Sequence, residues 1–413
     1  MRTALPDAGT DWPALEQRLA DLSAGDRDWR AGRVPLYVFR GTDDAAEVGQ
    51  RAFNAFFTEN ALGGKRAFHG LGEMERQVID MALGLFNAPD DGGGAMTGGG
   101  SESILVAVKA ARDHARAAGR RPPHNIVLPY SGHPAFDKAA DLMDLEVRRV
   151  PLGPDLRADV DAMAEAVDDR TILIVGSVPC FPHGVVDPVP ALSALAAGHD
   201  AWLHVDACVG GYLAPFVKAN GATLPDFDFA LPGVASISAD LHKFGFCPKP
   251  ASTVLFRRRT DMERAVMGTD QWPHGLFATP TVSGTRPGGA VAAAWAVLNH
   301  LGWQGYRDIA RRLMALTRAY VDGIEAIPGL RMLAQPDLSI VNFTADACDV
   351  AALAEAMDRR DWLPGRTLTP PGLHIMLSLL HAPARAPYLA DLAAAVEEAK
   401  QAGATQSATS TYA

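Results

Sequence analysis

Short apolar runs alternate with helical patterns through the middle of the chain. The apolar runs cover residues 125–128, 172–175, 201–205 and 253–256. Alanine-rich stretches with helical spacing lie between several of them, at residues 135–143, 155–167 and 189–198. Near-continuous apolar strands that alternate with helices are typical of a mostly parallel sheet covered by helices on both faces. The pattern therefore predicts an α/β fold.

The N-terminal residues 1–50 have the pattern of an arm. Asp11-Trp12-Pro13 is a favourable helix start, because Asp caps a helix N-terminus and Pro fits its first turn. Leu15, Leu19 and Leu22 then fall on one face of the helix that would follow.

The pattern changes again after residue 305, where long helical stretches at 311–326 and 350–359 surround shorter strands. We therefore predict a large domain over residues 51–305 and a smaller α+β C-terminal domain over residues 306–401. The tail 402–413 is rich in Ser, Thr and Ala and is predicted to be disordered.

Composition narrows the class of ligand. The chain has 413 residues, 48% of them hydrophobic and 21% charged, which is an ordinary balance for a soluble globular protein. Its formal net charge of −10 gives no broad basic surface for nucleic acid or an anionic membrane. A small anionic ligand could still be held by a local site.

The cysteines and the N-terminus indicate a cytoplasmic protein. Cys180, Cys208, Cys247 and Cys348 are widely spaced and form no CxxC pair, so reduced thiols are expected and no metal site is predicted. The first residues lack the apolar core of a signal peptide. We find no run near the roughly 18 apolar residues that a membrane helix needs.

A glycine-rich stretch at residues 92–103 is the first candidate for chemistry. It reads GGGAMTGGGSES and is followed by a clear helical pattern at 104–109. Glycines allow a ligand close to the backbone, and a helix N-terminus favours an anion. It matches neither a Walker loop nor a GxGxxG fingerprint. Taken alone, the stretch is more simply read as a flexible connector.

Three side chains extend this candidate site. Asp206 follows a buried strand in LHVDAC, His133 lies at a loop-to-helix entry in SGHPAF, and Lys243 follows a buried strand in SADLHK. Each residue, taken alone, has a simpler interpretation. Asp206 could cap a helix, His133 could be a packing residue, and Lys243 could be a solvated surface lysine. The three side chains fit the ring nitrogen, the ring face and the aldehyde carbon of pyridoxal phosphate, in that order. The glycine-rich stretch, as an anion site, fits its phosphate.

These motifs carry a family resemblance. The chain resembles the sphingosine-1-phosphate lyase branch of the group II pyridoxal-phosphate-dependent decarboxylases, which have fold type I. The resemblance runs from about Tyr37 to His381 and includes GGGSESILVAVKAARD, HPAFDKAA, FPHGVVDPVP, HVDACVGGY, SISADLHKFGFCPK, TDQWPHGLFATPTVSGTRPGG and IMLSLLHAP. It implies a fold type I large domain with a smaller C-terminal domain, and pyridoxal 5'-phosphate as cofactor.

The resemblance also implies roles for single residues. Lys243 matches the lysine that binds the cofactor covalently, and a desolvated lysine with a lowered pKa would be a ready nucleophile. Asp206 matches the carboxylate that keeps the pyridine nitrogen protonated. His133 matches the imidazole stacked on the ring.

The remaining matches concern the phosphate and the substrate. Gly100, Ser101 and His242 match phosphate contacts of the same chain, and Thr285 matches a hydroxyl from the neighbouring subunit. That last role implies a homodimer with shared sites. Lys249 matches a second lysine near the reacting amine substrate.

Tyr37 resembles an N-terminal active-site tyrosine of the lyases.

The chain departs from the lyase pattern at the substrate end. After Asn60 the lyases have a Leu-His-Pro-Asp type stretch, whereas residues 60–69 read NALGGKRAFH, which is longer and lacks that histidine. The lyases' Pro-Lys-Gly is Pro248-Lys249-Pro250 here. Both changes argue against the usual long-chain phosphorylated substrate, as does the lack of the membrane anchor that eukaryotic lyases carry.

Three functions follow from these observations. The first is a carbon–carbon lyase that cleaves a small polar or phosphorylated 2-amino-alcohol by a retro-aldol step. The second is an L-amino-acid decarboxylase with the same cofactor, and the third is a non-catalytic relative, which the intact Lys243, Asp206 and His133 disfavour.

A late C-terminal strand helps to choose between the first two functions. Many fold type I enzymes grip an α-carboxylate with an arginine there. Residues 372–380 read GLHIMLSLL, without arginine, which favours the lyase, although Arg366 is close by. Lys65, Arg66 or Lys249 could hold an anionic head group, but solvated surface charge is an equal reading for Lys65 and Arg66.

Overall fold

A seven-stranded sheet forms the centre of the large domain. The computed structural model describes residues 2–402. The strands of this sheet are β1 (Gly93–Thr97), β2 (Asn125–Pro129), β3 (Glu146–Val150), β4 (Thr171–Ser177), β5 (Trp202–Asp206), β6 (Val234–Ala239) and β7 (Ser252–Phe256). Their spatial order is β1-β7-β6-β5-β4-β2-β3, and only β7 runs antiparallel to its neighbours. The predicted mostly parallel α/β sheet is confirmed.

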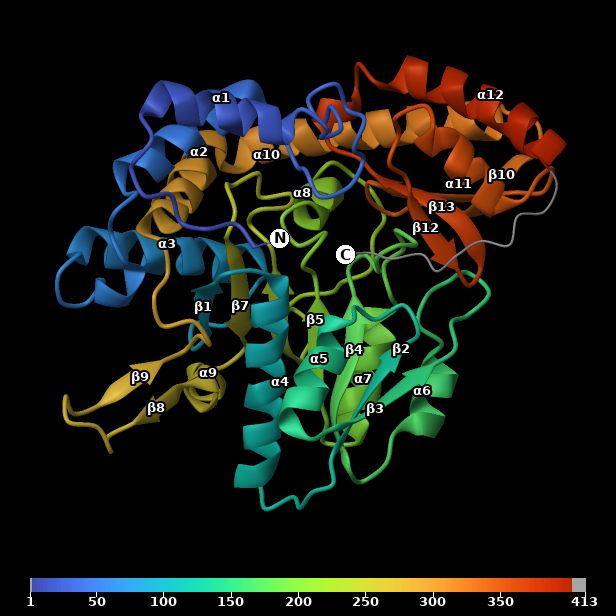
Figure 1. Ribbon diagram of the computed structural model, residues 1–413. Helices are drawn as coiled ribbons and strands as arrows, with labels where there is room; N and C mark the ends of the chain where they lie inside the picture. Colours follow the sequence, from blue (N-terminus) through green and yellow to red (C-terminus); the bar gives the residue numbers. More distant parts are fainter. Residues whose placement is uncertain (1, 403–413) are drawn as a thin grey trace.

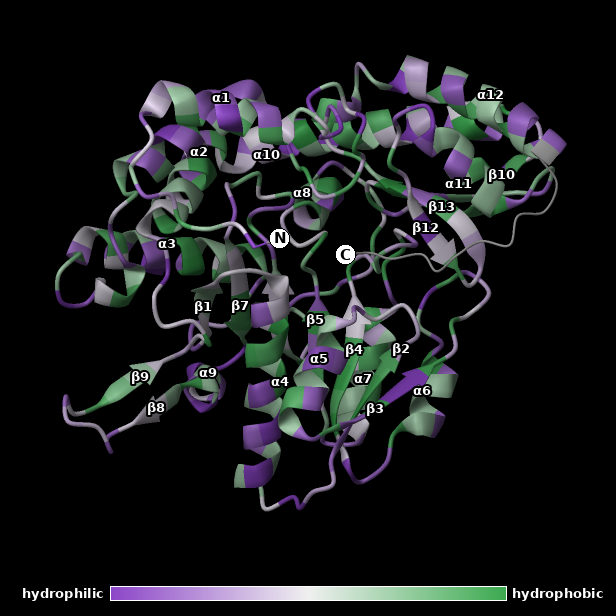
Figure 2. Ribbon diagram, in the orientation of Figure 1, coloured by the Kyte–Doolittle hydropathy of each residue, from purple (hydrophilic) through white to green (hydrophobic). Residues whose placement is uncertain are grey.

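Helices cover both faces of this sheet (Figure 1). Helices α4 (Gly100–Ala117) and α5 (Ala135–Met143) pack on one face, and α3 (His69–Leu85), α6 (Val160–Ala166) and α7 (Val189–Gly198) on the other. This explains the continuous apolar strands, since both faces are buried. Figure 2 shows β2 as hydrophobic, whereas the edge strand β3 is hydrophilic.

The three helices predicted between the strands of the large domain are confirmed with one difference. The predictions at 135–143 and 189–198 agree with α5 and α7. The helix predicted at 155–167 is shorter, because Asp159 caps α6 by accepting hydrogen bonds from two backbone N–H groups. Residues 155–159 lie in the turn before it.

A four-stranded antiparallel sheet lies in the C-terminal part of the chain. Its strands are β10 (Leu330–Ala334), β11 (Ile340–Ala345), β12 (Gly365–Leu368) and β13 (Pro371–Met376), in the order β10-β11-β13-β12. Helices α11 (Val350–Asp358) and α12 (Arg385–Ala402) pack together beside it. The smaller α+β region is therefore present, while its exact boundaries stay a prediction.

The remaining elements lie outside the two sheets. They are α1 (Trp12–Ser23), α2 (Asp43–Ala55), α8 (Ala214–Ala219), α9 (Arg259–Ala265), α10 (Gly288–Glu325), the short helices η1 (Ala61–Gly63) and η2 (Leu379–His381), and the hairpin of β8 (Met267–Thr269) with β9 (Phe277–Thr279). The predicted long helix at 311–326 is part of α10. Of the tail predicted to be disordered, residues 403–413 lie outside the described residues.

Residues 27–37 form a strap across the C-terminal region. The carbonyl groups of Arg33 and Pro35 accept hydrogen bonds from the N–H groups of Leu363 (3.1 Å) and Met376 (2.8 Å). The Arg27 guanidinium donates to the carbonyl of Trp362, which lies 335 residues later in the chain. The strap thus brings Tyr37 to the boundary between the two sheets.

Candidate active site

The carboxyl ends of the parallel strands meet at one edge of the large sheet, and the candidate residues follow them. Asp206 is the last residue of β5, and Lys243 lies in the turn after β6. His133 lies between β2 and α5, and Gly100 follows β1. This edge is where ligands bind in open α/β sheets.

Lys243 forms a buried ion pair. Its Nζ lies 2.9 Å from Oδ2 of Asp240, whose side chain is 1% exposed. Burial lowers the pKa of Lys243, but Asp240, together with smaller contributions from Cys208 and Asp206, outweighs burial, so the pKa is raised. The expectation of a lowered pKa for Lys243 is therefore wrong, because the Asp240 carboxylate, three residues earlier in the chain, stabilises the ammonium form.

Asp206 is 7% exposed and is held by two donors. Its Oδ1 accepts hydrogen bonds from the Cys208 N–H (3.1 Å) and the Ser238 hydroxyl (3.4 Å). Both donors come from the strand ends themselves, so the carboxylate has a fixed position at the sheet edge.

His133 lies within electrostatic reach of these groups. Its Nδ1 accepts a hydrogen bond from the Ala135 N–H (3.1 Å), so the neutral ring carries its hydrogen on Nε2. Burial lowers the pKa of His133, with a further lowering by Lys243 and an opposing effect of Asp206 and Asp240. The imidazole is therefore neutral near pH 7.

The glycine-rich stretch is a strand followed by a tight entry into α4. The reading of the stretch as a flexible connector is wrong for Gly93–Thr97, which pair with β7. A Cβ at Gly100 would lie 2.8 Å from Cys208 Sγ and 2.9 Å from Asp240 Oδ2, so only glycine fits there. Ser101 follows it in the first turn of α4.

His242 lies on the other side of this entry. The position of a Cβ at Gly99 is 3.7 Å from its Cε1 atom, and its Nδ1 lies 2.7 Å from the carbonyl oxygen of Ala251. Burial is the main cause that lowers the pKa of His242. The three predicted phosphate contacts of one chain, Gly100, Ser101 and His242, are therefore close to each other.

Thr285 lies in a segment that is anchored near the same edge. Its hydroxyl accepts a hydrogen bond from Asn60 Nδ2 (3.2 Å) and is exposed. Arg286 pairs with Glu75 and donates to the carbonyl of Met96 (3.2 Å). The contribution of Thr285 to a neighbouring subunit stays a prediction.

The rebuilt stretch 60–69 forms a helical turn. Asn60 caps η1 by accepting a hydrogen bond from the Leu62 N–H (3.0 Å). Its amide therefore serves both this turn and Thr285. Lys65 and Arg66 are exposed.

Lys249 and Tyr37 are in contact. Lys249 Nζ donates a hydrogen bond to the carbonyl oxygen of Tyr37 (3.0 Å). Partial burial lowers the pKa of Lys249, although much of its side chain is exposed, and the charge of Lys243 lowers it further. Tyr37 has a φ of +62°, an uncommon backbone conformation for a residue with a bulky side chain.

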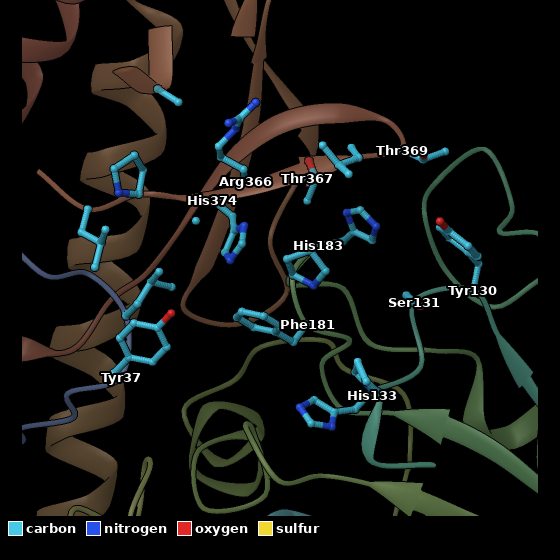
Figure 3. A pocket seen from close by; sticks show the side chains of 18 of the residues that line it. Tyr37, Tyr130, Ser131, His133, Phe181, His183, Arg366, Thr367, Thr369 and His374 are labelled. Atoms are coloured by element: carbon cyan, nitrogen blue, oxygen red, sulfur yellow. The ribbon is translucent and has the colours of Figure 1, made fainter. Parts of the chain in front are cut away.

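A cavity of about 910 Å³ opens from this edge toward the C-terminal sheet. Tyr37 and His133 line it, together with Phe181 and residues of β12 and β13 (Figure 3). Strand β13, all of which the structure describes, contains no arginine. Arg366 of β12 contributes to the lining, but its guanidinium is directed away from His133 and Tyr37.

Sequence reasoning missed Asp240 and the two histidines of the cavity, His183 and His374. A signal for Asp240 was its position at the end of a buried strand, three residues before Lys243. For His374 the signal was a single imidazole among apolar residues in GLHIM.

These residues suit pyridoxal phosphate. The glycine entry to α4 leaves backbone N–H groups free for a phosphate, Asp206 offers a carboxylate for a ring nitrogen, and Lys243 offers a primary amine. The large sheet with this set of groups at its edge defines a fold type I site for that cofactor.

Comparison with known proteins identifies the family. Residues 70–346 match the pyridoxal-dependent decarboxylase conserved domain. The chain therefore belongs to the pyridoxal-dependent decarboxylase family, and it is a lyase with pyridoxal phosphate as cofactor.

Three similar proteins show which branches of this family the chain resembles. Sphingosine-1-phosphate lyase of Oryza sativa subsp. japonica is 34% identical over 407 residues, which cover 97% of this chain and 75% of the rice protein. A probable L-tyrosine/L-aspartate decarboxylase of Methanothermobacter thermautotrophicus is 36% identical over 321 residues, covering 78% of this chain and 86% of that protein. The structure of Burkholderia pseudomallei K96243 sphingosine-1-phosphate lyase matches with a TM-score of 0.90 and 34% identity, covering 97% of this chain and 94% of that one.

Among residues 2–402, no helix combines the length and the apolar character that crossing a bilayer requires.

Proposed function

We propose that this protein is a carbon–carbon lyase that cleaves a 2-amino-alcohol by a retro-aldol step, as a sphingosine-1-phosphate lyase does. The observation that carries the proposal is the similarity to such lyases over nearly the whole chain, in sequence and in structure. The sequence of β13 supports the proposal, because this strand, which the structure describes in full, contains no arginine. The α-carboxylate of an amino-acid substrate would therefore lack its usual partner in this strand.

Each residue of the site has a task in this reaction. Bound pyridoxal phosphate supplies an electron sink for the charge that develops on the substrate carbon. Asp206 would keep a proton on the ring nitrogen of this cofactor, and the neutral His133 would pack against the ring face. Gly100, Ser101 and His242 would hold its phosphate, and Lys243 would supply the amine for its aldehyde carbon.

Lys249 is suited to take the proton of the substrate hydroxyl group. Its lowered pKa leaves a larger fraction of neutral amine near pH 7 than an ordinary lysine has. The Tyr37 carbonyl fixes the direction of its Nζ.

The competing function is decarboxylation of an L-amino acid, which the similarity to the archaeal decarboxylase favours. The two reactions differ in their products. We expect an aldehyde that a hydrazine traps, and no carbon dioxide, when the purified protein is screened with phosphorylated amino alcohols, 3-hydroxy amino acids and aromatic amino acids. Stoichiometric carbon dioxide from an amino acid, without an aldehyde, would assign the decarboxylase reaction instead.

The proposal includes a homodimer in which Thr285 of one chain contacts the phosphate bound by its partner. The exposed Thr285 hydroxyl and the firmly anchored Arg286 beside it support this arrangement.

A further inference from the structure

The wall of the cavity opposite His133 is formed by one face of the C-terminal sheet. Gly365 pairs with His374, Thr367 pairs with Gly372, and Asn342 pairs with His374. Because side chains alternate along a strand, these residues share a face of the sheet. Figure 3 shows His374 and Thr367 on the side of the cavity away from His133, with His183 between them and the large domain.

Several polar atoms on this wall are buried and without a hydrogen-bond partner. Within residues 2–402, this holds for both ring nitrogens of His374 and for Thr367 Oγ1, whose residues line the cavity. It also holds for Asn342 Oδ1, which lies on the same face of the sheet but outside the cavity lining. His183 Nδ1 accepts a hydrogen bond from Asn342 Nδ2 (2.8 Å), so a neutral His183 carries its hydrogen on Nε2. A buried polar atom without a partner is costly, and such atoms rarely gather on one wall unless something binds to them.

The backbone leaves room for these groups. A Cβ at Gly365 would collide with the His374 imidazole. A Cβ at Gly372 would lie 2.8 Å from Thr367 Oγ1 and 2.9 Å from Asn342 Oδ1. The His374 ring also packs edge-on against Phe181, with the ring centroids 4.8 Å apart. The positions of the polar atoms are thus fixed before any ligand arrives.

The two histidines of the cavity, His183 and His374, are uncharged at neutral pH. Burial lowers the pKa of His183 to about 4, and burial with the neighbouring His183 lowers the pKa of His374 to about 3. Arg366 pairs with Leu373, so it alternates onto the other face of the sheet. His374, His183 and Thr367 therefore offer both donors and acceptors but no charge, which suits an uncharged hydroxyl group better than a phosphate or a carboxylate.

We propose that His374, together with His183 and Thr367, binds a hydroxyl group of the substrate at the end of the cavity away from His133. This inference rests on the proposed function and narrows its substrate class to amines that carry such a hydroxyl group. A purely hydrocarbon tail would leave the same atoms without partners.

The experiment measures binding to the holoenzyme. Two series of primary amines, with three to eight carbons, are compared: simple alkylamines and their ω-hydroxyl derivatives. Dissociation constants are obtained from the change in cofactor absorbance, which does not depend on the bond that the enzyme breaks. We expect the hydroxylated amine to bind about tenfold more tightly at one or two chain lengths.

Two variants test the wall itself. His374→Phe keeps an aromatic ring against Phe181 but removes both nitrogens, and it should abolish the preference. Thr367→Val, which removes one hydroxyl group at similar volume, should reduce it severalfold. His124→Phe is the matched control. His124 is also buried, and within residues 2–402 both of its ring nitrogens lack a hydrogen-bond partner, but it lies outside the cavity. This control should keep the preference.

Equal binding of both series at every length, or a preference that survives in folded His374→Phe and Thr367→Val proteins, would overturn the inference. The product screen is separate. If it yields carbon dioxide while the hydroxyl preference persists and depends on His374, the lyase reaction fails and the hydroxyl site stands.

Discussion

Lys243 and Asp240 form the pair of charges at the centre of the site. Burial alone would raise the pKa of Asp240, but Lys243 and His242 lower it below its ordinary value. The carboxylate in turn holds Lys243 as an ammonium group. An amine attacks an aldehyde only after it has lost its proton, so Asp240 controls the pH at which Lys243 can bind the cofactor.

We expect Asp240→Asn to speed the covalent capture of pyridoxal phosphate by the cofactor-free protein near pH 7. Without the carboxylate, burial lowers the pKa of Lys243, and each unit gives about a tenfold larger fraction of neutral amine. Stopped-flow absorbance over a range of pH measures the rate. Asp228→Asn, at another buried aspartate, is the control. A pH profile identical to that of the wild type would show that Asp240 does not set the pKa of Lys243.

Three buried histidines should make the folded protein sensitive to acid. Burial lowers the pKa of His204 and His183 to about 4 and that of His374 to about 3. The unfolded chain, with histidines near their ordinary pKa of about 6.5, therefore binds more protons than the folded one below that pH. The free energy of unfolding should decrease as the pH falls from about 6.5 toward 4.

Replacing His374 by Phe removes one of these groups. The slope of the free energy of unfolding against pH should then become smaller by up to about 1.4 kcal/mol per pH unit between pH 6.5 and 4.5. Urea denaturation at several pH values gives this slope for both proteins. Taking the difference cancels other groups, such as Asp187 with its pKa raised by burial to about 6. Equal slopes would mean that His374 takes up a proton in the folded state.

At the scale of elements, the junction of β1 with α4 is the part that positions the phosphate. Gly100→Ala should weaken pyridoxal phosphate binding by at least tenfold, because the new Cβ would collide with Cys208 Sγ and Asp240 Oδ2 and displace the helix N-terminus. Equilibrium titration of the cofactor-free protein measures the affinity.

Gly98→Ala is the matched control for this junction. In the described structure its Cβ would approach only the end of the flexible Glu102 side chain, at 3.1 Å. We expect cofactor affinity within about twofold of the wild type. Equal losses in the two variants would show that the junction does not need glycine specifically at position 100.

Some elements follow directly from the sequence, and others depend on distant pairing. Helices α5 and α7 are bounded by local signals and were predicted to the residue. Strand β1 begins with Gly93 and Gly94, which have no side chains to show an alternating pattern. It is a strand because it pairs with β7, more than a hundred residues later in the chain, and no local signal reveals that partner.

The candidate site divides in the same way. Lys243, Asp206 and His133 follow strands or open a helix, so their positions could be inferred from the apolar runs and the family motifs. Asp240 and His374 lie at or within buried strands. Which face a strand residue occupies depends on the pairing register, which the sequence alone does not give.

At the scale of the whole molecule, the surface of α1 bears on assembly. The helix begins at Trp12 behind the Asp11 cap, as predicted. Its leucines share a face, yet Leu19 is 56% and Leu22 82% exposed. An exposed apolar stripe of this kind is consistent with the predicted homodimer.

Mixed dimers test whether the sites are shared. Lys243→Ala removes the amine, and Thr285→Asp places a negative charge where the partner's phosphate would lie. Each protein alone should be inactive. After mixing and exchange, one site in each mixed dimer keeps both intact halves, so activity should recover to about a quarter of the wild type. Verified mixed dimers without any recovery would contradict a shared site.

The strap formed by residues 27–37 has a consequence for biosynthesis. Arg33 leaves the ribosome early, whereas its partner Arg360 follows 327 residues later, or roughly 16 to 65 s at ordinary rates of translation. During that interval the strap has none of its C-terminal hydrogen-bond partners. Lys249 can meet the Tyr37 carbonyl earlier, but the C-terminal sheet that closes the cavity emerges almost last. The wall that bears Tyr37 is thus the first part of the cavity to be synthesised and one of the last to be fixed in place.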